Sequence, residues 1–488
     1  MNKYFKFIYI IFIAILFVNY ANGINLQAAS QFGELKSYEL SQVYSVDQMV
    51  KFTYSVLCND LESSSPMCLS NLKNLSEFGG YSINQIANNA LGIESVAEYN
   101  ITYYTQGLNF GSSVTPPTIE SKATTLVSGS IVMPQGIPSN KIKGVILFYH
   151  ATVVNKNEAG PSSDSESDIE YASVYASQGY IVVLPDYIGY GVDPQDFHPY
   201  VLFPQVNVFS GVNMLSAARQ LFTSLGISNK ETLNLYITGY SEGGAYALWT
   251  SRMLQQGDIS LKSANMNLKV TVPVNGAYDL IGEQLPFALA NVSRSESKNE
   301  FNIQNTLKAT LYKPFLTAYV FSAAANYNRL PCSSVMFADF CNLSNEHVPY
   351  TVPDLFGVNQ PSDESVLMLL YSQATSMPPF SDTNNSIKAF VNPLSDLLID
   401  EAESASLVSW KTFSPVTLVC LRRDSIVTNL NTMSAYDGMT SLSDKGLVDQ
   451  IFVDNLQFTY GLLPIDHDNA RIFTDIAALS VFNRYSKP

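Results

Sequence analysis

From about residue 124 onward, apolar residues follow two alternating patterns along the chain. Runs such as Gly144–Tyr149 and Tyr180–Leu184 are almost wholly apolar, which is typical of strands buried on both faces. Between the runs, apolar residues recur at the spacing of a helix with one buried face. This alternation predicts an α/β fold with a mostly parallel sheet covered by helices on both faces. The expected strands are 124–133, 144–149, 180–184, 233–238, 270–274, 416–421 and 450–453, and the expected helices are 168–178, 208–222, 245–254 and 470–482.

The alternation also predicts how the chain is divided. It stops near residue 280 and returns near residue 416, so we expect residues 281–407 to form an insertion that caps the sheet. The core of the fold is then made of 116–280 and 408–488. Residues 24–115 are rich in Ser and Asn with weak periodicity, and the pattern assigns them no structure.

The N-terminus has the pattern of a secretory signal peptide. Lys3 and Lys6 precede an apolar run of 12 residues, 7–18, which is too short to span a bilayer comfortably. Small residues follow at 21–23, and we expect cleavage after Gly23. The alternative is a signal anchor that stays in the membrane. Cleavage predicts a secreted or lumenal protein.

Charge narrows the range of partners. The 488-residue chain has a net charge of −15, and removal of the signal peptide takes away two lysines and no acid, which gives −17. An acidic surface of this kind repels nucleic acid and anionic membranes. No later segment is long and apolar enough to span a membrane, and the sequence gives no indication of oligomeric state.

The five cysteines suit an oxidising compartment. Cys58 and Cys68 are close in sequence, as are Cys332 and Cys341, which predicts two local disulfides. Cys420 lies in an apolar run and is expected to be a buried free thiol. N-glycosylation sequons, which also arise by chance, begin at Asn74, Asn100, Asn291, Asn342 and Asn384.

A G-x-S-x-G pentapeptide, Gly239–Gly243, lies between an expected strand and an expected helix. In that context it is typical of a nucleophile elbow, where a sharp turn holds the serine at an unfavourable backbone angle and needs glycines beside it. Ser241 is therefore the predicted nucleophile. The alternative is a glycine-rich turn with an inert serine.

The predicted acid is Asp424, which follows the expected strand 416–421. A carboxylate at this point can hold the histidine tautomer and stabilise the imidazolium. The alternatives are that Asp424 is a surface aspartate paired with a neighbouring arginine, or that Asp279, after the preceding strand, is the acid instead.

The predicted base is His467, because it completes the chain order Ser–Asp–His expected of this fold. His198 is the main competitor, but it precedes the elbow. Asp466 and Asp468 flank His467 in sequence and are poorly placed to reach its ring.

The loop after the strand 144–149 is the expected source of an oxyanion hole. Backbone N–H groups in the segment His150-Ala151-Thr152, together with the N–H of Glu242, could stabilise the oxyanion. We favour Thr152 as the donor from this loop. His150 is expected to shape the loop rather than to titrate in catalysis.

Three segments, 184–191, 198–200 and 239–244, resemble the secretory lipases and related secreted esterases of the α/β-hydrolase superfamily. The likeness covers about 120–280 and 408–488. It implies hydrolysis of carboxylic esters, with a helical cap over an acyl pocket.

Two departures stand out from this resemblance. His150-Ala151-Thr152 replaces a His-Gly pair common in relatives, and the residue after the nucleophile is the acidic Glu242. Asp186-Tyr187 is expected to buttress the loop above the sheet.

The motifs together predict a secreted serine hydrolase, a lipase or esterase acting on small-molecule or lipid esters through an acyl-enzyme on Ser241. This chemistry requires no metal and no organic cofactor. The alternatives are a peptidase or amidase on the same scaffold, or a non-catalytic binding protein of hydrolase ancestry.

Overall fold

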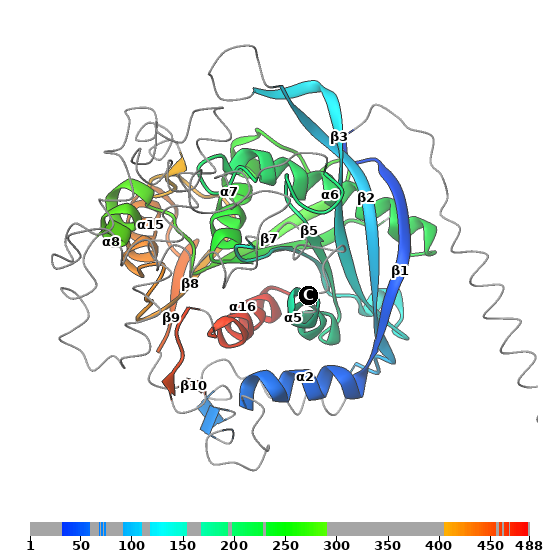
Figure 1. The fold of residues 1–488 in the computed structure, drawn as a ribbon, viewed down its shortest axis with the longest axis horizontal. Helices are drawn as coiled ribbons and strands as arrows, with labels where there is room; N and C mark the ends of the chain where they lie inside the picture. The colour runs from blue at the N-terminus through cyan, green and yellow to red at the C-terminus, as the bar shows by residue number, and fades with distance from the viewer. Residues whose placement is uncertain are drawn as a thin grey trace, which may run out of the picture.

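The computed structural model in Figure 1 describes most of the predicted core. The predicted signal peptide, nearly all of the predicted cap, the Cys332–Cys341 pair and the last three sequons lie outside the described residues and stay predictions. The residues described are 32–58, 68, 70–71, 73–74, 91–109, 118–153, 167–193, 198–227, 231–289, 405–454, 458–460, 463–467 and 469–486.

Within the described residues, one nine-stranded sheet forms the centre of the molecule, in the order β1-β2-β3-β5-β4-β6-β7-β8-β9. Neighbours from β5 to β9 run parallel, whereas β1, β2 and β3 join the β5 edge as antiparallel strands. The predicted mostly parallel sheet is thus confirmed. The strands are β1 (Leu35–Ser45), β2 (Ser95–Asn109), β3 (Thr118–Gln135), β4 (Gly144–Tyr149), β5 (Tyr180–Pro185), β6 (Leu233–Tyr240), β7 (Met266–Val274), β8 (Val416–Leu421) and β9 (Val448–Val453), with a separate short pair, β10 (Thr459–Tyr460) and β11 (Leu463–Pro464).

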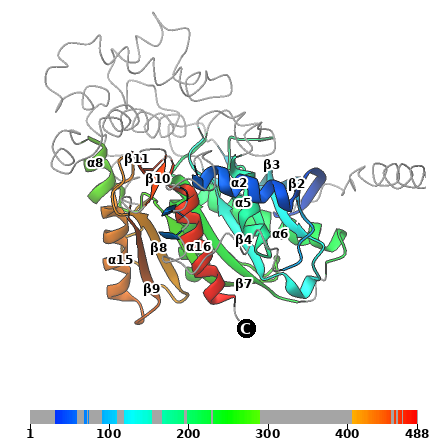
Figure 2. The ribbon, with the colours of Figure 1, turned by 90° about the horizontal axis from the view of Figure 1, so that it is seen from below.

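Helices cover both faces of the sheet, as the alternating pattern predicts. Figure 2 shows α2, α5 and α16 together on the near side, while α6 and α7 lie on the opposite side. The helices are α2 (Val46–Cys58), α5 (Ser167–Ser177), α6 (Pro204–Ser224), α7 (Glu242–Gln256), α8 (Leu285–Leu289), α15 (Leu430–Leu442) and α16 (Arg471–Tyr485), with a 3-10 turn at Ser139–Lys141 and a π turn at Leu280–Gln284.

Strand β4 shows why this fold needs unbroken apolar runs. All six of its residues are buried. Val145 and Leu147 pack in the core cluster that contains α6, and Ile146 and Phe148 pack in the cluster that contains α5 and α16. Because successive side chains of a strand point to opposite faces, a strand between two helix layers must be apolar at every position.

The N-terminal region, to which the sequence pattern assigned no structure, contributes part of the sheet. Strand β1 pairs with β2 and β2 pairs with β3. Helix α2 follows β1 directly and ends at Cys58, which forms the predicted disulfide with Cys68. Cys420 is a buried free cysteine, as predicted.

The described helices also bear on membrane insertion. None of them combines the length and the apolar character that a membrane crossing requires.

Candidate active site

Ser241 occupies the sharp turn between β6 and α7. Its backbone φ is 55° and its ψ is −115°, a conformation that L-residues rarely adopt. A Cβ atom added to Gly239 would lie 2.2 Å from the Gly243 carbonyl oxygen, and one added to Gly243 would lie 2.1 Å from that of Tyr149. Both glycines are therefore required by close packing of backbone on backbone, which is the physical reason for the G-x-S-x-G pattern.

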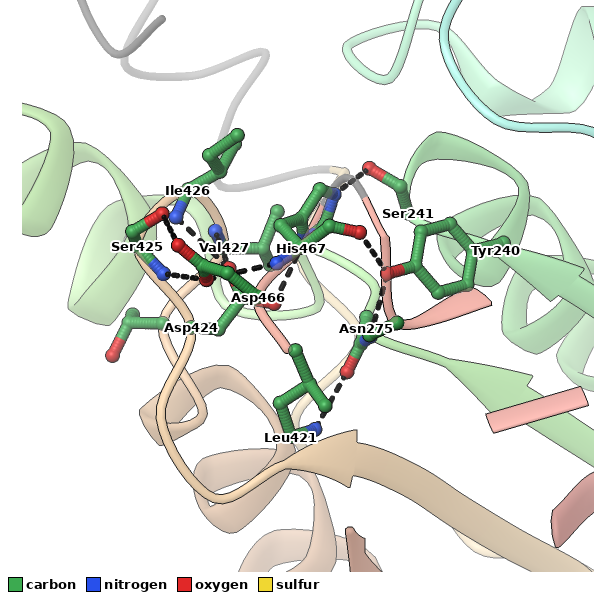
Figure 3. Close-up of polar contacts among 12 residues, drawn as sticks. Tyr240, Ser241, Asn275, Leu421, Asp424, Ser425, Ile426, Val427, Asp466 and His467 are labelled. Atoms are coloured by element: carbon green, nitrogen blue, oxygen red, sulfur yellow. Dashed lines mark hydrogen bonds and ion pairs between the residues drawn. The ribbon is translucent and has the colours of Figure 1, made fainter. Parts of the chain in front are cut away.

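His467 lies within hydrogen-bond distance of both other residues predicted to act with it, Ser241 and Asp424, as Figure 3 shows. Nε2 of His467 lies 2.9 Å from Oγ of Ser241, and Nδ1 of the same ring lies 2.7 Å from Oδ2 of Asp424. A carboxylate accepts hydrogen bonds, so Nδ1 carries a proton, and in that tautomer Nε2 has none and can accept one from the serine hydroxyl. The arrangement can remove a proton from Ser241 during nucleophilic attack.

Local backbone contacts fix the Asp424 carboxylate. Its Oδ1 accepts hydrogen bonds from the N–H groups of Ile426, at 2.9 Å, and Val427, at 2.8 Å. Oδ2 is left to face the ring of His467, and the side chain is 1% exposed. The tight turn after β8 therefore presents one oxygen of the acid to the histidine.

The rival acid, Asp279, is bound elsewhere. It caps the π turn by accepting a hydrogen bond from the N–H of Gly282, at 2.8 Å, and it accepts another from the hydroxyl of Ser434, at 2.6 Å. The structure therefore brings Asp424, and not Asp279, to His467.

Asp466 has a supporting position that the sequence analysis missed. Its Oδ1 accepts hydrogen bonds from the backbone N–H of His467, at 2.8 Å, and of Ser425, at 3.1 Å, and its Oδ2 accepts one from the Ser425 hydroxyl. Burial, followed by the nearby Asp424 carboxylate, raises the pKa of Asp466. As expected, it does not bond to the histidine ring. It instead joins the loop of the acid to the loop of the base.

A second bridge joins the ends of three strands to the histidine loop (Figure 3). The backbone N–H of Leu421 donates to Oδ1 of Asn275 at 2.8 Å, and Nδ2 of Asn275 donates to the Tyr240 hydroxyl at 3.1 Å. The Tyr240 hydroxyl in turn donates to the His467 carbonyl. Asn275 has φ 47°, which Asn tolerates better than most residues. An Asn at the end of a strand was the one sequence signal for this bridge.

The loop after β4 lies directly against the elbow, because Gly243 packs on the carbonyl groups of Tyr149 and His150. The Thr152 hydroxyl lies 2.9 Å from the hydroxyl of Tyr200. Within the described part of the chain, the N–H groups of Thr152 and Glu242 have no hydrogen-bond acceptor. Two amides near the elbow are thus available to a ligand.

The two other histidines near the elbow have different partners. His150 stacks on Tyr187 with ring centroids 3.8 Å apart, consistent with a role in shaping the loop. His198, the competing candidate for the base, contacts Glu242 through Nε2 and lies 2.9 Å from the Ile188 carbonyl oxygen through Nδ1. Both of its ring nitrogens are occupied away from Ser241.

The described residues contain no candidate metal site. Among them, no group of three or more His, Cys, Asp or Glu side chains is arranged to hold a metal ion.

Comparison with known proteins identifies the fold. No family model matches the chain, and no curated protein matches it in sequence. Solved structures do match. A candidate hydrolase from Legionella pneumophila superposes with a TM-score of 0.64 at 20% identity, covering 93% of this chain and 98% of its own.

Two further structures carry more specific names. The rice cell wall degrading esterase LipA from Xanthomonas oryzae matches with a TM-score of 0.65 at 17% identity, covering 94% of this chain and 100% of its own. Candida antarctica lipase A in its closed state matches with a TM-score of 0.51 at 12% identity, covering 93% and 82%. The chain therefore has the α/β-hydrolase fold.

Proposed function

We propose that the chain is a serine hydrolase of carboxylic esters, related to the secretory lipases and esterases. The observation that carries the proposal is the contact of one ring, His467, with both the Ser241 hydroxyl and the Asp424 carboxylate. The strained φ of Ser241 supports it, since residues with a strained backbone cluster at active sites. The named structural neighbours include an esterase and a lipase, which favours esters as the substrate class.

The geometry suggests a two-step mechanism. His467 accepts the Ser241 proton as the hydroxyl oxygen attacks the ester carbonyl, and Asp424 stabilises the resulting imidazolium. The N–H groups of Glu242 and Thr152 donate to the oxyanion. The imidazolium then protonates the leaving alcohol, and an acyl-enzyme remains on Ser241. Water attacks this ester by the reverse sequence and releases the acid.

The proposal also covers the compartment in which the protein acts and the division of the chain into a core and a cap. A disulfide at Cys58–Cys68 favours an oxidising compartment, in keeping with the predicted signal peptide at residues 1–23. We also keep the predicted division of the chain into a core, 116–280 and 408–488, and a cap insertion, 281–407.

A fluorophosphonate probe, together with a series of p-nitrophenyl esters from acetate to octanoate, tests the proposal. We expect the probe to label the wild-type protein on Ser241 and to leave Ser241→Ala unlabelled, with ester hydrolysis lost in the variant. The melting temperatures of the two proteins should be similar. Hydrolysis that persists in Ser241→Ala, or a wild-type protein that cleaves aryl amides faster than esters, would contradict the proposal.

A further inference from the structure

An acidic side chain lies buried directly after the proposed nucleophile. Glu242 follows the proposed nucleophile and is the first residue of α7, and its side chain is fully buried. Its own N–H is a proposed donor to the oxyanion. A carboxylate so close to a developing negative charge would oppose that charge, because like charges repel strongly in a site shielded from water.

His198 is positioned to neutralise this carboxylate. Its Nδ1 lies 2.9 Å from the carbonyl oxygen of Ile188, and a carbonyl only accepts hydrogen bonds, so Nδ1 carries a proton. Its Nε2 contacts Oε1 of Glu242, and that contact requires one further proton between the two atoms. The histidine and the acid therefore hold two protons together and form a pair with no net charge.

Tyr246 determines where the second proton resides. Its hydroxyl donates to the same Oε1 of Glu242 at 2.7 Å. Burial and the Glu242 carboxylate raise the pKa of Tyr246 well above its usual value, so the hydroxyl keeps its proton and remains a donor. An oxygen that already accepts from Tyr246 is stabilised as a carboxylate, which favours the proton on Nε2. The pair is thus an imidazolium and a carboxylate.

The loop that carries His198 touches both sides of the proposed oxyanion hole. Two residues after His198, the hydroxyl of Tyr200 contacts the hydroxyl of Thr152, the other proposed donor residue. The ring of His198 stacks near that of Tyr187, with centroids 5.5 Å apart, and lies close to that of Tyr190, at 4.7 Å. One loop therefore contacts the two residues whose amides the mechanism uses.

We propose that His198 is a positioning residue of the oxyanion hole, which neutralises Glu242 and fixes the start of α7 so that the Glu242 N–H can stabilise negative charge. This inference rests on the proposed function. It assigns to His198 a role separate from that of the base, His467, and it explains how an acid is tolerated directly after the nucleophile.

The test is a charge-repair cycle with three variants: His198→Gln, Glu242→Gln and the double variant. His198→Gln removes the imidazolium alone and leaves the buried Glu242 carboxylate beside the oxyanion. We expect kcat for p-nitrophenyl butyrate to fall roughly thirtyfold, with KM changing much less, as for one uncompensated charge several ångströms from a developing anion. In the double variant no charge remains, and two amides can hydrogen-bond to each other. We therefore expect it to recover most of the lost kcat, which simple loss of packing would not allow.

His150→Gln is the matched control, because it removes the other buried histidine of the same aromatic cluster. Adding Glu242→Gln to His150→Gln should not raise kcat. A His198→Gln variant with wild-type kcat, or a folded double variant no better than His198→Gln, would overturn the inference. If His198→Gln does not fold, the double variant decides: a folded, active protein supports the pair, and an unfolded one refutes it. Wild-type protein that neither hydrolyses the ester nor takes the fluorophosphonate label would refute the proposed function instead.

Discussion

The hydroxyl of Tyr240 donates a hydrogen bond to the backbone carbonyl of His467, so the residue before the proposed nucleophile also holds the proposed base. Tyr240 is 3% exposed, and its hydroxyl is in turn held by Asn275 at 3.1 Å. Because Ser241 follows directly in the chain, one side chain couples the position of the serine backbone to that of the histidine loop. The distance from Nε2 to Oγ, which the mechanism depends on, is thereby set from two sides.

Tyr240→Phe should lower kcat by about tenfold with little change in KM, because it removes this hydrogen bond and loosens the histidine against the serine. Steady-state kinetics on a p-nitrophenyl ester measure the effect. Tyr175→Phe is the control, since the Tyr175 hydroxyl also bonds to a backbone carbonyl of α16, that of Asp475, away from the site. It should lower the melting temperature and leave kcat unchanged. Equal kinetic effects in the two variants would show that Tyr240 acts only through stability.

Asp424→Asn should reduce kcat by up to about 10⁴, because an amide at this position can favour the wrong tautomer of His467. Asp279→Asn is its counterpart, since Asp279 bonds to Gly282 and Ser434 instead of the histidine. The loss of these bonds should destabilise the fold by about 1 kcal/mol with no effect on turnover. Kinetics and thermal melts of both variants distinguish the outcomes. If Asp279→Asn lost activity and Asp424→Asn kept it, Asp279 would be the acid.

The strands that the sequence located best are those buried on both faces. β4 and β8 begin and end where the apolar runs do, since each residue packs against a helix layer on one face or the other. β1 was not anticipated, because most of its residues are half-buried or exposed at the sheet edge and leave little apolar pattern. Its place depends on antiparallel pairing with β2 across about fifty residues of chain, which no local signal encodes.

At the candidate site too, the sequence locates some residues and does not reveal others. Ser241 and Asp424 could be chosen because each follows a predicted strand of a fold whose strand ends converge, and His467 because it completes the expected chain order Ser–Asp–His. His467 and Ser241 are 226 residues apart in the chain and are still brought into contact. The supporting roles of Asn275 and Asp466 were missed because most of their partners lie on other loops and strand ends. Such contacts exist only once the loops are placed, and residue type alone does not reveal them.

Replacing the Cys58–Cys68 disulfide with two serines should lower the free energy of unfolding by about 2.5 kcal/mol, because the bridge closes a short loop and restricts the unfolded chain. The bridge lies at the end of α2, which packs on α5 on the face of the sheet opposite α7. Activity at low temperature should therefore be unchanged. Thermal melts with and without reductant measure the effect, and Cys420→Ser, which removes the buried free thiol, is the control. A wild-type melting temperature that does not respond to reductant would contradict the prediction.

Asp186 lies at the end of β5, directly before Tyr187, and is 1% exposed. Its Oδ2 accepts a hydrogen bond from the Ser128 hydroxyl at 2.6 Å. Burial raises the pKa of Asp186 to about 7, although the bond from Ser128 opposes the shift. The folded state therefore binds a proton at this residue more tightly than the unfolded chain does, whose aspartates have a pKa of about 4. The stabilisation is fully present below about pH 4 and is lost as the pH rises through about 7.

Asp186→Asn should remove this pH dependence, because an amide cannot ionise. For the wild-type protein, the Asp186 contribution to the free energy of unfolding should be about 2.5 kcal/mol larger at pH 5 than at pH 8. The wild-type protein and the variant share all other titrating groups. The difference in the free energy of unfolding between pH 5 and pH 8 should therefore be smaller in Asp186→Asn by this amount. Urea unfolding at the two pH values measures it. Asp258→Asn, at an exposed aspartate after α7, is the control and should keep the wild-type difference. If Asp186→Asn keeps the wild-type difference in the free energy of unfolding as well, the Asp186 carboxyl group is already ionised in the folded protein at pH 5. The buried residue before Tyr187 then carries a negative charge.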